Sequence, residues 1–136
     1  MDGGCDGRKR IAYIAHPVAG DVEGNIRSIL SILREIRLNA DSMAEWEDII
    51  PVAPYVMALQ YLSDSEPGER LLGMEENTAY FESGFIDELI LAGDAISKGM
   101  RAEVGLAYSL GIPVTCYNPA LEAELDAIMS GMEGKR

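Results

Sequence analysis

Glu103 places a carboxylate in the segment ISKGMRAEVG, whose other residues predict the beginning of a helix. If Ser97 is the N-cap, the backbone N–H groups of Lys98, Gly99 and Met100 form the first turn and have no partner within the helix. Glu103 follows Gly99 by four residues, so its side chain points back along one helix face, under a residue without a side chain. A carboxylate near backbone donors and the positive end of a helix dipole is expected to be ionised. Such a group can act as a nucleophile toward a sugar carbon.

The alternative for Glu103 is a solvated glutamate on a helix surface, where most glutamates are found. Its neighbours favour a more buried position, because Val104 and Ala107 lie on a helix face that is predicted to pack against the core. We therefore treat Glu103 as the candidate nucleophile.

A second group of polar residues follows the first apolar segment of the chain, in YIAHPVAGDVEGN. Tyr13 could orient a carboxylate through its phenol, while His16, Gly20, Asp21 and Asn25 are expected to line the turn that leads into the next helix. A single histidine after a strand is also common as a loop or packing residue. Gly20 can be required only for the backbone conformation of the turn, without a role in binding. The segment does not have the spacing of GxGxxG, which argues against a dinucleotide cofactor.

The elements that carry these residues are predicted to alternate between strand and helix. We expect strands at residues 11–15, 48–55, 87–93 and 112–118, and helices at 21–38, within 56–85, at 97–111 and at 119–131, with Pro67 opening one of the middle helices. This alternation predicts an α/β fold with a parallel sheet of four or five strands and helices on both faces. Ligands of such sheets bind at the carboxyl ends of the strands, so the site is expected in the loops after Ala15, Tyr55, Ala92 and Tyr117.

Composition limits the organisation and the function classes. The chain has 136 residues, a net charge of −12 and only 11 lysines and arginines, so a nucleic-acid polymer is not an expected partner. We expect a flexible leader at residues 1–9 and a single domain at residues 10–136. No signal peptide or membrane span is recognised, which predicts a cytoplasmic protein. The two cysteines do not have metal-ligand spacing, and no metal site is expected.

Several segments together resemble one known family. AYIAHPVAG, PGERLLG, ISKGMRAE and the sequel AYSLGIPV are similar to motifs of the nucleoside 2-deoxyribosyltransferase-like superfamily, and most of all to a phage and bacterial branch of it. The resemblance spans residues 11–117. It implies a flavodoxin-like or Rossmann-like three-layer sandwich that is dimeric, with a neighbouring subunit completing the site.

The resemblance also implies roles for individual residues. The glutamate at position 103 would attack the anomeric carbon with help from Tyr13, and Ser97 would contact the phosphate of a nucleoside 5′-monophosphate. The family's second acidic residue, which protonates the leaving base, would be Glu82, with Glu69 and Asp87 as alternatives. No cofactor is implied. In the hydrolases of the family, serine and arginine of the first loop face the phosphate, whereas this chain has Pro17 and Ala19 there.

The sequence therefore predicts an enzyme, an N-glycosidase or a 2-deoxyribosyltransferase, that cleaves or transfers the N-glycosidic bond of a nucleoside or nucleoside 5′-monophosphate. One alternative is a non-catalytic nucleotide-binding or sensing domain with the same fold. Another is a protein-interaction module that uses the acidic surface and the methionine-containing helices.

Overall fold

The computed structural model describes residues 9–38 and 46–134, so eight of the nine residues of the predicted leader lie outside the described part. The elements follow the alternation that the sequence predicts. In chain order they are β1 (Arg10–Ala15), α1 (Val22–Leu38), β2 (Ile49–Val52), α2 (Pro54–Ala58), α3 (Pro67–Glu82), β3 (Glu88–Leu91), α4 (Lys98–Ser109), β4 (Val114–Cys116), the short 3-10 helix η2 (Pro119–Leu121) and α5 (Glu122–Gly134).

Within the described residues the sheet has four parallel strands in the order β2-β1-β3-β4. This is the strand order that begins a flavodoxin-like sheet. The predicted α/β fold class is therefore confirmed. Strand β1 is central, and its register pairs Tyr13 with Val52 on one side and with Leu89 on the other.

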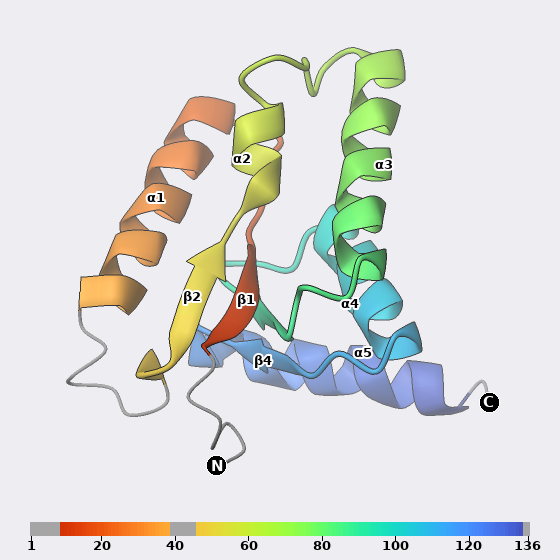
Figure 1. Cartoon of the computed structure of the whole chain (residues 1–136). Coiled ribbons are helices and arrows are strands. Elements are labelled where there is room, and N and C mark those ends of the chain that lie inside the picture. The colour runs from red at the N-terminus through yellow and green to blue at the C-terminus, as the bar shows by residue number, and fades with distance from the viewer. Residues whose placement is uncertain (1–8, 39–45, 135–136) are drawn as a thin grey trace.

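Helices cover both faces of the sheet and make three layers (Figure 1), with α1 on one side and α3 and α4 on the other. One buried cluster joins strand residues to α3 and α4 and includes Tyr13, Ala15, Leu89, Leu91, Phe81, Met100, Val104 and Ala107. The other cluster joins the opposite strand face to α1 and includes Ala12, Ile14, Ile90 and Ile36. Because side chains alternate along a strand, β1 directs Tyr13 toward the layer that contains α4.

The strands β3 and β4 are shorter than predicted, and the last helix begins only after η2. Two further boundary differences involve a proline or a glycine. The second strand is shorter than predicted, because Pro54 begins α2 at its first helical position, where the missing N–H has no cost. The last helix does not end at Gly131 but continues to Gly134. Gly131 does not have a positive φ angle, so it is an ordinary helical residue here.

The helices predicted within 56–85 correspond to the end of α2 and to α3, and Pro67 occupies the first position of α3 as predicted. None of the helices in residues 9–38 and 46–134 is long and apolar enough to cross a membrane.

Candidate active site

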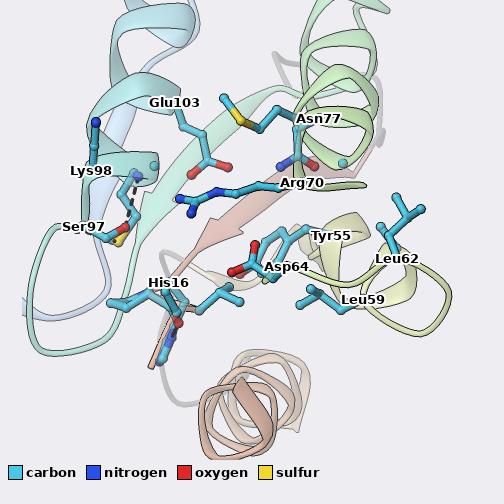
Figure 2. Close-up of a pocket in the computed structure, with 18 of the residues that line it drawn as sticks. His16, Tyr55, Leu59, Leu62, Asp64, Arg70, Asn77, Ser97, Lys98 and Glu103 are labelled. Atoms are coloured by element: carbon cyan, nitrogen blue, oxygen red, sulfur yellow. Dashed lines mark hydrogen bonds between the residues drawn. The ribbon is translucent and has the colours of Figure 1, made fainter. Parts of the chain in front are cut away.

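A cavity of about 270 Å³ lies at the carboxyl edge of the sheet. Its walls come from the connections that follow β1, β2 and β3, the second of which includes α2, and from the N-terminal halves of α3 and α4 (Figure 2). These are three of the four loops in which the sequence predicts the site. The loop after β4 has a supporting role, because Asn118 Nδ2 donates to the carbonyl of Gly93 at 2.8 Å.

Glu103 lines this cavity, and Tyr13, which does not line it, contacts Glu103 from the buried side. The Tyr13 hydroxyl donates to Glu103 Oε2 at 2.6 Å, and the tyrosine is fully buried. The Tyr13 ring is held between Tyr55 and Phe81, with ring centroids 5.6 Å and 4.7 Å away. Because β1 and these two rings fix the phenol, its hydrogen bond fixes the orientation of the Glu103 carboxyl group.

The charge state of Glu103 differs from the expectation of an ionised carboxylate. Burial raises the pKa of the Glu103 carboxyl to about 7, and the hydrogen bond from Tyr13 lowers it only in part. The expected helix-dipole effect does not outweigh desolvation. Burial and the neighbouring Glu103 carboxylate raise the pKa of Tyr13 well above its usual range, so the phenol remains a proton donor at neutral pH.

The first turn of α4 has the geometry that its sequence predicts. Ser97 is the N-cap, and its Oγ accepts from Met100 N at 3.2 Å, while Ser97 N lies 3.4 Å from Met100 Sδ. The N–H groups of Lys98 and Gly99 have no acceptor among the described residues. A Cβ atom on Gly99 would meet only Ser97 Oγ, at 4.0 Å, so packing does not require glycine there. Because Gly99 has no side chain, the N–H groups of Lys98 and Gly99 remain accessible from the cavity.

His16 lines the cavity, but both of its ring nitrogens are engaged elsewhere. Nδ1 lies 2.7 Å from the Pro17 carbonyl and Nε2 lies 3.0 Å from Ser28 Oγ. Its ring also packs against Gly93, whose φ angle of +88° and close approach to Pro17 leave no room for a side chain. His16 therefore shapes the wall and is not placed to exchange protons with a substrate.

The other predicted binding residues of the first loop stabilise the backbone conformation of that loop. Asp21 Oδ1 accepts from Gly24 N at 3.0 Å as the N-cap of α1, and Asn25 Nδ2 donates to the Val18 carbonyl at 2.9 Å. Gly20 has a φ angle of +97° and lines an adjoining hollow. None of the three lines the cavity that contains Glu103, so they support the loop and are not brought together with the carboxylate.

The structure does not support Glu82 as the second acidic residue. Glu82 is exposed at the last residue of α3, whereas the first half of this helix faces the cavity. Asp87 lies at the opposite edge of the sheet, where it accepts from Ile11 N at 2.8 Å. Glu69 does line the cavity, but its Oε1 accepts from Ser63 N at 2.8 Å. A half-buried carboxylate that the sequence did not suggest, Asp64, lines the same cavity.

Further cavity residues lie in α2 and α3, where the sequence predicts helices but no site residue other than Glu82 and its alternative Glu69. Tyr55 is a buried wall residue whose hydroxyl donates to the Ile14 carbonyl at 2.7 Å. Helix α3 adds a row of residues at helical spacing: Arg70, Gly73, Met74 and Asn77. This spacing of three, four and seven residues was a readable signal for one helix face within the motif PGERLLG and its sequel.

No group of three or more histidine, cysteine or acidic side chains that could hold a metal ion occurs among residues 9–38 and 46–134.

Comparison with protein-family models matches residues 10–117 to a domain of unknown function, DUF7768. Neither the curated proteins nor the solved structures contain a match to the chain.

Proposed function

Since the chain belongs to the DUF7768 family, whose function is unknown, we propose a function from the geometry of its site: cleavage or transfer at the N-glycosidic bond of a nucleoside or nucleoside 5′-monophosphate. One observation carries the proposal. The Glu103 carboxyl lines a cavity of small-molecule size and is oriented by a buried phenol 2.6 Å away. The similarity of the motifs to nucleoside 2-deoxyribosyltransferase-like proteins supports the same chemistry.

In the proposed reaction the Glu103 carboxylate attacks the anomeric carbon of the sugar. The C–N bond breaks, the base departs with the bonding electrons and takes up a proton, and a glycosyl ester of Glu103 remains. Water or a second base then attacks the same carbon and releases Glu103. Two displacements at one carbon retain the anomeric configuration. No cofactor is required, because the nucleophile belongs to the chain and the second reactant is water or a base.

Asp64 is the group that we assign to protonation of the leaving base, in place of Glu82. Figure 2 shows its carboxyl group facing the cavity from the side of Tyr55, whereas Glu103 enters from α4. Two carboxyl groups on different walls of one cavity can serve as nucleophile and acid toward a substrate that lies between them.

The direct test is incubation of the protein with a panel of ribonucleosides, deoxyribonucleosides and their 5′-monophosphates. Chromatography is expected to show free base from at least one member of the panel, and a second base added in excess distinguishes transfer from hydrolysis. Binding of a panel member by calorimetry without release of its base would instead support the non-catalytic nucleotide-sensing domain.

We further propose that the active form is a homodimer. Helices α2 and α3 and the segment between them expose large apolar side chains, among them Met57, Tyr61, Leu71, Leu72 and Met74 with exposed fractions of 67%, 60%, 64%, 49% and 52%. Among the large apolar side chains of α3, Phe81 is buried, whereas Leu71, Leu72 and Met74 remain largely exposed in the protomer. Light scattering coupled to size exclusion is expected to give twice the mass of the chain, and a monomeric mass at micromolar concentration would refute the dimer.

A further inference from the structure

The motif PGERLLG is a sequence feature to which the proposed reaction gives no role. Pro67 begins α3, and Glu69 Oε1 accepts from Ser63 N at 2.8 Å, which ties the first turn of the helix to the preceding loop. Gly73 follows Arg70 by three residues on the cavity face, and a Cβ atom there would meet only Leu62 Cδ1, at 4.0 Å. The motif therefore fixes the start of α3 and leaves space beside one long side chain, that of Arg70.

Arg70 extends across the cavity. Figure 2 shows its guanidinium group directed toward Ser97 and Glu103 on the opposite wall, whereas Lys98 lies at the edge of the cavity. Arg70 also lines an adjoining hollow of about 730 Å³. Arg70 therefore lies between the cavity and the adjoining hollow, where a ligand that enters from solvent can contact it.

The charge of Arg70 is available for a ligand. Within the described residues, ion pairs join Arg10 to Asp48 and Glu88 and join Arg101 to Glu124, and Arg70 takes part in none. Arg34 is also exposed and in none of these ion pairs, but Arg70 differs from it because Arg70 lines both the cavity and the adjoining hollow. The planar fork of N–H donors of Arg70 fits the oxygens of a phosphate better than it fits an uncharged sugar or base.

We propose that Arg70 binds the phosphate group of a nucleoside 5′-monophosphate and thereby selects the phosphorylated substrate over the nucleoside. The inference rests on the proposed function, because it names the substrate class of the same cavity. The free N–H groups of Lys98 and Gly99 and the Ser97 hydroxyl lie on the wall that Arg70 faces, so they can share the phosphate oxygens.

The test measures binding separately from catalysis. In the E103Q background, which removes the nucleophile, calorimetric titrations with a nucleoside 5′-monophosphate, with ribose 5-phosphate and with the nucleoside are compared with and without Arg70→Gln. We expect Arg70→Gln to weaken the binding of both phosphorylated ligands by at least about tenfold, which is the range for loss of a charge-assisted hydrogen bond. The affinity for the nucleoside should change by no more than about twofold. Arg70→Lys, which keeps the charge but loses the fork, is expected to lie between the two.

The matched control is Arg34→Gln, because Arg34 is exposed on α1 and does not line the cavity, so this change removes the same charge without an effect on binding. The inference would be overturned if Arg70→Gln weakened the binding of nucleoside and monophosphate equally, or weakened neither. It would also be overturned if no phosphorylated ligand bound measurably. Base release by the wild-type protein is measured in parallel. Absence of release refutes the proposed reaction, whereas a phosphate preference independent of position 70 refutes only the role of Arg70.

Discussion

Glu103→Gln is expected to lower base release by at least about three orders of magnitude, because the variant keeps the shape of the side chain but has no nucleophilic carboxylate. A glutamine Oε1 atom can still accept the hydrogen bond that Tyr13 donates to Glu103 at 2.6 Å, so the cavity should retain its geometry. Chromatographic assay of free base, under saturating substrate and with excess enzyme, measures the residual rate.

The control for this experiment is Glu75→Gln, which removes a carboxylate from an exposed position of α3 that does not line the cavity and should leave the rate unchanged. Base release by Glu103→Gln at a rate within tenfold of wild type would end the assignment of Glu103 as nucleophile.

Thermal unfolding tests whether the Glu103→Gln variant is folded. Because the pKa of Glu103 is raised to about 7 in the folded protein, ionisation of this group makes the wild type less stable as pH rises from about 4.5 through 7. Glutamine does not ionise, so the variant lacks this loss of stability. The thermal midpoint of the variant minus that of the wild type should therefore be larger at pH 8 than at pH 5.

Activity is expected to increase with pH along a limb whose midpoint lies near 7. The carboxylate is the reactive form of Glu103, and burial raises the pKa of this carboxyl to about 7, so protonation inactivates the nucleophile below that value. Two pH units below the midpoint, kcat/KM should be about one hundredfold under its plateau. The measurement is kcat/KM for base release between pH 5 and pH 9, where the substrate remains stable.

Tyr13→Phe separates this explanation from other causes of a pH limb. The phenol donates to the ionised form of Glu103 and lowers the pKa of the carboxyl, so its removal should move the midpoint upward, by about one unit for a typical hydrogen bond to a charged group. At pH 7 the variant would be slower than wild type, and part of the difference would disappear at pH 9. A midpoint that stays in place or moves downward would show that another group controls the limb.

Local patterns in the sequence were sufficient for the fold and for one wall of the site. Apolar segments of strand length alternate with helical periodicity, and parallel strands joined by helices allow few arrangements, so the sheet and its carboxyl edge could be predicted. Ser97 as a helix N-cap and Pro67 as a first helical residue were predictable for the same reason, because capping depends on neighbours within one turn. The residues alone predicted that the Tyr13 phenol could orient a carboxylate, and the resemblance to a family implied that this carboxylate is Glu103, which lies 90 positions away.

The sequence by itself determined the alternation of elements, the caps and the edge at which a ligand can bind, because these depend on interactions between residues close in the chain. The tertiary structure decided which side chains share the cavity. It brings Arg70 and Asp64 to it and leaves Glu82 at the far end of α3, because the direction of α3 relative to the sheet sets which helix end faces the site. It also decided the ionisation of Glu103, since desolvation depends on everything that packs around a group and not on its neighbours in the chain.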